Sequence, residues 1–300
     1  MGSLREPRHL RKPVAHRPGA RLPWPSGSRT VATRRRAHSE MTREVPEPYD
    51  AAESRAVPHP VLKKYYESER DRRPFVNALF DNAAEHYDFV CGLGSLGSGR
   101  YYRRWVLLQS GLRAGMKFLD VATGTGMIAQ GATRILGKPG AVIGLDPSAG
   151  MLREARRIVA VPLVQGTVEE LPFESDHFDF LCIGYALRHV GDLGVAFREC
   201  LRVLKPGGRL LVLEITLPHS PLGKRFFRVY FERVLPRVTR LSTGSAKAEL
   251  LMKYYWDTIA NCVPPERILG VLETSGFADI EHRVRGGLLS EYIGVKPGGR

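Results

Sequence analysis

The chain has 300 residues, of which 43% are hydrophobic and 25% are charged. This length fits one large domain with appendages, and the composition excludes a chain that is disordered throughout. No run of about 18 apolar residues occurs, so the sequence predicts no membrane-spanning helix. The four cysteines stand far apart, without a C-x-x-C pair. This spacing argues against a zinc site or a disulfide framework and favours a reducing compartment.

The net charge of +14 is concentrated near the N-terminus. Residues 1–40 carry ten Lys and Arg against two acidic residues, or +8, which leaves 14 − 8 = +6 for the rest of the chain. This segment lacks hydrophobic periodicity and is rich in Arg, Pro, Gly, Ser and Ala. We therefore predict a disordered basic leader over residues 1–45.

Three interpretations of this leader stay open. An organellar transit peptide is Arg-rich and acid-poor, but the early prolines oppose the amphipathic helix that it needs. A tether to nucleic acid or to a membrane fits the charge. An upstream extension, with initiation at Met41, fits the composition, because GC-rich codons give these residue types. The segment has no apolar h-region, which argues against secretion.

The predicted elements after the leader form a helical part and then an alternating part. Residues 57–112 read as helical and aromatic, interrupted by a Gly/Ser-rich break, so we predict a helical N-terminal cap over 46–112. In the predicted core, 113–300, short apolar runs alternate with helical segments, which predicts a parallel sheet with helices on both faces. The expected strands are 117–121, 141–146, 161–166, 178–184 and 209–215, and the expected helices are 127–136, 149–159 and 193–204.

The C-terminal pattern predicts a helix over 265–276 and an antiparallel hairpin of strands 279–285 and 289–295, joined by Gly286-Gly287. The fold class is therefore α/β, with a mostly parallel seven-stranded sheet that ends in an antiparallel hairpin. Few nucleotide-binding folds end in this way.

A glycine loop follows the first expected strand, at Gly124-Thr125-Gly126. Glycines let the backbone approach a ligand closely, and the start of the next helix offers free N–H groups. Asp146 ends the second strand, where its carboxylate can accept hydrogen bonds from both ribose hydroxyls. These residues also satisfy the G-x-G-x-x-G/A fingerprint of NAD-binding folds, so the loop alone is ambiguous.

Two features favour a different nucleotide. Asp120, ahead of the glycines, would repel a pyrophosphate, but it suits a ligand with positive charge, such as an amino-acid ammonium beside a sulfonium. A Pro206-Gly207-Gly208 turn also precedes the fifth strand.

At these residues the sequence resembles the class I S-adenosylmethionine-dependent methyltransferases and, within them, the ubiquinone/menaquinone C-methyltransferase (UbiE) family. The resemblance covers about residues 80–297. It implies a methyltransferase with a Rossmann-like class I fold and S-adenosyl-L-methionine as cofactor. Further segments support the resemblance to this family. They are Tyr87-Asp88, Ser95-x-Gly97, Arg188, Leu204–Arg209, Leu213-Glu214 and Gly286-Gly287…Tyr292-Ile293-Gly294-x-Lys296.

The resemblance also implies which residues bind the cofactor. Asp146 aligns with the contact to the ribose, and Thr167-Val168 fall where the adenine edge is read. Thr167 departs from the usual Asp or Asn but keeps one hydrogen-bonding hydroxyl. Ala122 replaces the first glycine of the motif, and Gly184 replaces a small polar residue. The predicted cofactor residues are Asp120, Ala122, Gly124, Thr125, Gly126, Asp146, Thr167, Val168 and Gly184.

The resemblance further implies catalytic residues beyond the fourth strand and in the cap. Arg188 aligns with an arginine that stabilises a phenolate directly or through water, and a structural salt bridge is the alternative. His189 stands where the family has Asn; it is either a general base or a helix-cap or surface residue. Tyr87 is expected to close over the pocket or to be a core tyrosine. We expect no metal.

A basic, aromatic segment over 221–241 lies within a predicted lid insertion, 218–260. Its apolar residues recur at helical spacing and six basic residues surround them. A basic amphipathic helix with aromatics can lie on an anionic membrane. The alternative is a lid helix that packs its apolar face onto the substrate pocket, and the two roles are compatible.

The leading functional hypothesis is C-methylation of a hydrophobic quinol or phenolic ring of the ubiquinone/menaquinone type. Departures from the family at Cys91, Gly99, Thr167 and His189 motivate an alternative, O- or N-methylation of a specialised small-molecule metabolite. A distant alternative is an RNA-binding or RNA-modifying protein, although the Asn/Asp-Pro-Pro-aromatic motif of amino-methyltransferases is absent.

The expected partner is a small hydrophobic acceptor, such as a prenylated quinol, and not a specific nucleic acid. A homodimer is left open. We expect a cytoplasmic protein, with peripheral contact at the inner face of the membrane through 221–241 and mitochondrial targeting as alternatives.

Overall fold

The computed structural model describes residues 56–94 and 99–298. The predicted leader, 1–45, lies outside the described residues, as does the start of the predicted cap. Among the helices that are described, none is long and apolar enough to cross a bilayer.

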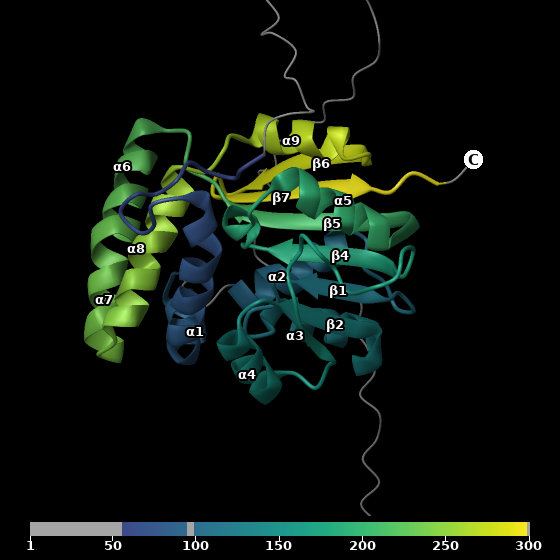
Figure 1. Cartoon of the computed structure of the whole chain (residues 1–300), viewed down its shortest axis with the longest axis horizontal. Helices are drawn as coiled ribbons and strands as arrows, with labels where there is room; N and C mark the ends of the chain where they lie inside the picture. Colours follow the sequence, from purple (N-terminus) through teal and green to yellow (C-terminus); the bar gives the residue numbers. More distant parts are fainter. Residues whose placement is uncertain (1–55, 95–98, 299–300) are drawn as a thin grey trace, which may run out of the picture.

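A seven-stranded sheet forms the centre of the molecule, in the order β3-β2-β1-β4-β5-β7-β6 (Figure 1). Strands β1 to β5 are parallel, and β7 pairs antiparallel with both β5 and β6. The predicted fold class is confirmed. The strands are β1 (Phe118–Val121), β2 (Val142–Asp146), β3 (Leu163–Gln165), β4 (Phe178–Gly184), β5 (Leu204–Ile215), β6 (Ala278–Arg285) and β7 (Leu289–Val295).

Helices cover both faces of this sheet because alternate strand residues point in opposite directions. In β4, Leu181 and Ile183 join a core cluster with residues of α5 and α9, whereas Phe180 and Cys182 join a second cluster with residues of α2 and α3. The helices are α1 (Glu69–Gly94), α2 (Gly99–Gln109), α3 (Met127–Leu136), α4 (Ala149–Ile158), α5 (Leu193–Val203), α6 (Pro221–Val229), α7 (Leu235–Thr243), α8 (Ala246–Ala260) and α9 (Pro265–Thr274), with short turns η1 (Pro139–Ala141), η2 (Leu187–His189) and η3 (Tyr230–Val234).

A third cluster joins the N-terminal cap to the predicted lid. Buried residues of α1, α6, α7 and α8 pack together, among them Leu79, Phe227, Leu251 and Trp256. These helices stand side by side at one end of the sheet, on the left in Figure 1. The cap and the lid therefore share one hydrophobic core.

Three predicted elements differ from the structure. Residues 56–68 form turns and extended chain, and α1 starts only at Glu69, where the backbone N–H and the hydroxyl of Ser68 both donate to Asp71 in the first turn. Strand β5 begins at Leu204, since the Pro206-Gly207 turn shifts its register against β4 without ending it. The helix predicted over 221–241 contains one π-helical turn, η3, between α6 and α7.

Candidate active site

The order of the strands reverses between β1 and β4. Strands β2 and β3 lie on one side of β1, and β4 and β5 lie on the other. Ligands of open α/β sheets bind at the carboxyl ends of the strands at such a point. The predicted cofactor residues lie at or just beyond the ends of β1, β2, β3 and β4, while the predicted catalytic residues lie on α1 and η2. The fold thus gathers both sets at one edge of the sheet.

The loop after β1 is built from left-handed backbone. Ala122, Gly124 and Gly126 have φ of 55°, 56° and 87°. A Cβ at Gly126 would lie 2.9 Å from Val159 Cγ2, so this position at the start of α3 requires glycine. Ala122 adopts the same conformation with a side chain, which is uncommon for a residue other than glycine. The loop therefore leaves the N-terminus of α3 open to a ligand.

Asp146, at the end of β2, is held by backbone donors. Its Oδ2 accepts a hydrogen bond from Gly124 N at 2.8 Å, and its Oδ1 accepts one from Ser148 N at 2.9 Å. Burial raises the pKa of Asp146 to about 6, partly offset by these two bonds. Each carboxylate oxygen keeps a further lone pair, so the group can still accept from ribose hydroxyls.

Asp120, at the end of β1, is fully buried and only half satisfied. Its Oδ2 accepts from the Thr123 hydroxyl at 2.6 Å and from Ala129 N at 2.9 Å, whereas its Oδ1 has no hydrogen-bond partner among the described residues. Burial raises the pKa of Asp120 to about 7, while the nearby Arg103 charge lowers it in part. An unpartnered buried carboxylate oxygen fits a cationic donor such as an ammonium group.

Helix α1 is hydrogen-bonded to the loop after β1 and to the loop after β2. The Thr125 hydroxyl donates to Asp88, and Asp81 Oδ1 accepts from Ser148 Oγ at 2.6 Å and from Gly150 N at 2.8 Å. A Cβ at Gly150 would lie 2.9 Å from the Asp81 backbone, so glycine is needed where α4 meets α1. The cap therefore closes the site from above the glycine loop.

The remaining predicted cofactor residues have structural roles of their own. The side chain of Val168 is buried in the core cluster under the sheet, so only its backbone is free for a ligand. Thr167, half-buried, pairs with Glu170 in an isolated β-bridge. A Cβ at Gly184 would lie 2.1 Å from Ile128 Cδ1, so the Ile128 side chain of α3 would have to move to admit a larger residue there.

The three predicted catalytic residues meet around Tyr255 of α8. The Tyr87 and Tyr255 hydroxyls are hydrogen-bonded at 2.7 Å. The Arg188 guanidinium carbon lies 5.2 Å from the centre of the Tyr255 ring, and the His189 ring lies 5.8 Å from it. Chemistry-bearing side chains of α1, η2 and α8 therefore share one aromatic centre.

Arg188 is fully buried and forms an ion pair with Glu214 of β5. Burial opposes its charge most strongly, but Glu214 and smaller contributions from Tyr255 and other neighbours together raise the pKa of Arg188, so the guanidinium stays charged. Within residues 56–94 and 99–298, Nη2 of Arg188 and Oε1 of Glu214 have no hydrogen-bond partner. The pair is thus a salt bridge that keeps one donor and one acceptor unused.

His189 is packed among aromatic rings rather than exposed. It stacks on Tyr254 at 5.6 Å between ring centres and meets the edge of Phe80 at 5.1 Å. Burial, followed by the charge of Arg188, lowers the pKa of His189 well below its usual value. Neither ring nitrogen has a hydrogen-bond partner in the part of the chain that the structure describes. The ring is therefore neutral near pH 7 and carries unused hydrogen-bonding capacity.

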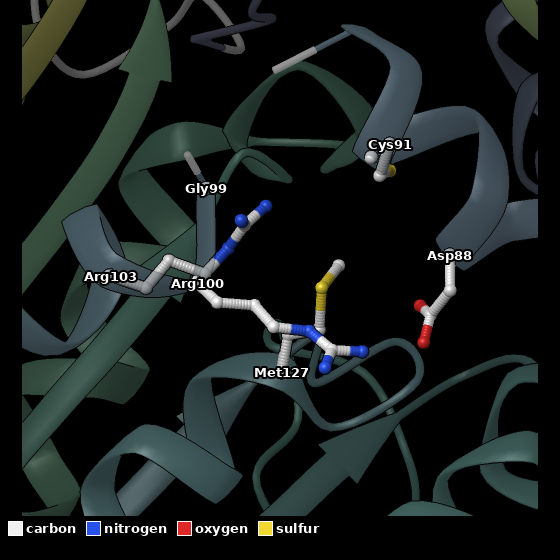
Figure 2. A pocket seen from close by; sticks show the side chains of 7 residues that line it. Asp88, Cys91, Gly99, Arg100, Arg103 and Met127 are labelled. Atoms are coloured by element: carbon white, nitrogen blue, oxygen red, sulfur yellow. The ribbon is translucent and has the colours of Figure 1, made fainter. Parts of the chain in front are cut away.

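A cavity of about 300 Å³ opens between the end of α1 and the starts of α2 and α3. Figure 2 shows Asp88 and Cys91 on one side of it and Arg100 and Arg103 on the other. The Arg103 guanidinium lies 5.0 Å from the centre of the Tyr185 ring and, among the described residues, has no ion-pair partner. Arg103 is thus a partly buried cation whose charge acts on Asp120 but which forms no direct ion pair within the described part of the chain.

Sequence reasoning missed two of these residues. Arg103 stands four residues before Leu107 and three before Val106, both fully buried, so helical spacing places it on the inner face of α2. That signal was available in the sequence. Tyr255 carries no comparable signal, because the contact that matters joins it to a residue 168 positions away.

Solved structures share this fold. An S-adenosylmethionine-dependent methyltransferase from Thermotoga maritima covers 73% of this chain and 99% of its own, with 20% identity and a TM-score of 0.52. Phosphoethanolamine N-methyltransferase 2 of Haemonchus contortus, solved with S-adenosyl-L-methionine, covers 78% of this chain and 61% of its own, with 19% identity and a TM-score of 0.53. The [4+2]-cyclase SpnF matches with a TM-score of 0.52 at 17% identity. At these identities the likeness shows the fold alone.

The sheet, the glycine loop and the two carboxylates define a class I methyltransferase fold with a site that suits S-adenosyl-L-methionine. The model of the ubiE/COQ5 methyltransferase family matches residues 66–296. The UbiE ubiquinone/menaquinone C-methyltransferase of Cellvibrio japonicus is 35% identical over 74% of this chain and 91% of its own length. That of Pseudomonas paraeruginosa is 32% identical over 84% and 99%. The chain belongs to the ubiE/COQ5 family and is an S-adenosyl-L-methionine-dependent methyltransferase.

Proposed function

We propose that this methyltransferase C-methylates a hydrophobic quinol or phenolic ring, most simply a prenylated quinol. The observation that carries the proposal is the match to relatives named for ubiquinone/menaquinone C-methylation over 91% and 99% of their lengths. The setting of the site supports it, because unpartnered polar atoms of Arg188, His189 and Glu214 lie among aromatic rings. A ring with hydroxyl groups matches both features.

For the cofactor, the proposed assignments follow the donors and acceptors that are still unused. S-adenosyl-L-methionine, when bound, supplies an electrophilic methyl group. Asp146 accepts from the ribose hydroxyls and Asp120 Oδ1 accepts from the ammonium. Thr125 and the Thr167 hydroxyl, with the backbone of Ala122, Gly124, Gly126, Val168 and Gly184, complete the predicted contacts. Arg103, which lacks an anion, pairs with the carboxylate of the methionine part.

For the acceptor, the proposed role of Arg188 is to lower the pKa of a ring hydroxyl. The unused Nη2 donates to the hydroxyl oxygen, directly or through water, and stabilises the phenolate that makes the neighbouring ring carbon nucleophilic. With the cofactor bound, that carbon would take the methyl group from the sulfonium, which would leave as S-adenosylhomocysteine, and the same carbon would then lose its proton to water. His189 and Tyr87 orient the ring, since a buried neutral histidine is a weak base.

The test is complementation of cells that lack the quinone-ring C-methyltransferase, with extracted quinones analysed by mass spectrometry. We expect methylated quinone from the intact chain and its loss in Asp146→Ala. Persistent demethylated quinone, from a chain that is expressed and binds the cofactor, would contradict the quinone assignment. O- or N-methylation then becomes the leading candidate, favoured by the departures at Cys91 and His189, and analysis of the methylated product identifies the atom. The RNA alternative depends on residues 1–40, outside the described residues.

We place this activity in the cytoplasm, where a quinol acceptor would be reached from the inner face of the membrane. This placement follows the acceptor chemistry.

A further inference from the structure

The segment α6–η3–α7 presents an unusual outer face. It is the outermost layer beside α8, at the left edge of Figure 1. Leu222, Phe226 and Leu241 are 79%, 73% and 85% exposed, and Val229 and Val234 are more than 40% exposed. These five are most of the nine large hydrophobic side chains exposed in the part of the chain that the structure describes. We call them the outer apolar row.

The opposite side of the same segment is buried. Phe227 and Leu235 are buried and Phe231 is partly buried in the cluster with α1 and α8. Residues four apart drift by about 40° per step around a regular α-helix. The π-turn η3, with its wider i→i+5 spacing, offsets this drift, so one buried row runs the length of the segment. The outer apolar row is therefore distinct from the buried face of the segment. The periodicity of the sequence alone does not separate the exposed apolar residues from the buried ones.

The outer apolar row is surrounded by positive charge. Six exposed basic residues accompany one acidic residue, Glu232, which gives 6 − 1 = +5 for the segment. None of the six has an ion-pair partner among the described residues. The six are Lys224, Arg225, Arg228, Arg233, Arg237 and Arg240.

We infer that this outer face docks on an anionic lipid surface. Exposed Leu and Phe side chains insert at the boundary between headgroups and acyl chains, while Lys and Arg reach the anionic headgroups. A nucleic acid would use the charge but leave the apolar row unexplained. The inference rests on the proposed function in one respect, because it names the surface from which a prenylated quinol would be reached. The segment α6–η3–α7 packs on α1 and α8, which contribute Tyr87 and Tyr255 to the site. Docking itself is independent of which atom is methylated.

The experiment is vesicle flotation of the full chain without any acceptor. Vesicles of phosphatidylcholine with 30% phosphatidylglycerol are compared with pure phosphatidylcholine, at low and high salt. We expect binding to the anionic vesicles that weakens at high salt. The variant R225Q/R228Q/R237Q should lose about a hundredfold in affinity, at about fivefold per charge. The variant L222S/F226S should lose at least about tenfold.

Two matched controls lie away from this face. Tyr101→Ser removes an aromatic ring that is 75% exposed on α2, and Arg156→Gln removes an exposed charge on α4. Both should bind vesicles like the parent. Equal loss in the controls, or no loss in the face variants, would overturn the inference. The inference would also be overturned if the parent chain self-associates and L222S/F226S abolishes self-association without changing vesicle binding. It would likewise be overturned if the face variants lose RNA binding while their vesicle binding is unchanged.

This assay separates the inference from the proposed function. Vesicle binding without quinone methylation would support the docking face and contradict the proposed quinol acceptor. Quinone methylation without vesicle binding would support the acceptor and contradict the docking face.

Discussion

The two halves of the active site differ in how fully their polar groups are satisfied. On the proposed cofactor side, Asp146 is held by two backbone donors, α1 is fastened to the loops through Asp81 and Asp88, and one buried atom, Asp120 Oδ1, has no partner among the described residues. On the proposed acceptor side, four buried polar atoms of Arg188, Glu214 and His189 have no partner among these residues. Buried polar groups are ordinarily hydrogen-bonded, so exceptions call for a missing partner. The comparison supports a preformed loop on the proposed cofactor side. On the proposed acceptor side, the hydrogen bonds of the buried polar groups are completed only when an acceptor or water binds.

The largest effect should come from breaking the buried ion pair. Arg188→Met or Glu214→Leu leaves an uncompensated charge and should lower the free energy of unfolding by about 3–5 kcal/mol. The double variant R188M/E214L removes both charges, and its stability should return to within about 1–2 kcal/mol of the parent. Denaturant unfolding monitored by circular dichroism measures all three. Equal destabilisation in the single and double variants would contradict the uncompensated-charge account.

The second effect concerns the preformed side. Asp146→Asn keeps the shape but removes the charged acceptor, and should weaken binding of S-adenosylhomocysteine about a hundredfold, measured by calorimetry. Thr167→Val, which removes a single neutral hydroxyl, should cost about fivefold. A ranking in which Thr167→Val costs more than Asp146→Asn would refute the assignment of the ribose contact.

Arg103 tests where the two halves meet. Arg103→Leu should weaken binding of S-adenosylhomocysteine about tenfold or more, because a charge-assisted bond to its carboxylate is lost. Binding of methylthioadenosine, which has no amino-acid part, should stay unchanged. Arg104→Leu, on the exposed side of α2, is the control. If both ligands bind the variant normally and only the acceptor KM changes, Arg103 belongs to the acceptor side.

The last effect is a dependence on pH. Burial raises the pKa of Asp146 from 3.8 to about 6 and that of Asp120 to about 7, so the folded protein without ligand holds these protons to higher pH than the unfolded chain. Their contribution to stability is present below pH 4 and is lost as the pH rises to 7. A ligand that needs the charged forms shows the opposite trend. Affinity for S-adenosylhomocysteine should fall about tenfold or more between pH 7.5 and 5. A flat calorimetric profile would contradict these roles.

Much of the fold around the proposed cofactor site could be predicted from the sequence. Helix α3 and strands β4 and β7 begin and end where the hydrophobic pattern put them, and the glycine loop and Asp146 mark themselves by residue type and position. The acceptor side was less accessible. The sequence placed Arg188 and His189 after β4, but Tyr255 approaches them from α8 and Glu214 from β5. The hydrophobic periodicity also did not predict the π-turn η3. One wider turn rotates every later residue away from the position that it would have on a regular α-helix.

The most direct test of the central claim is to measure cofactor affinity and turnover together in the double variant R188M/E214L. Its fold should be retained, so the measurement isolates the chemistry of the pair. The account predicts affinity for S-adenosylhomocysteine within about twofold of the parent and turnover of the quinol acceptor reduced at least about a hundredfold. Turnover close to that of the parent would contradict the account and reduce Arg188 and Glu214 to a structural salt bridge.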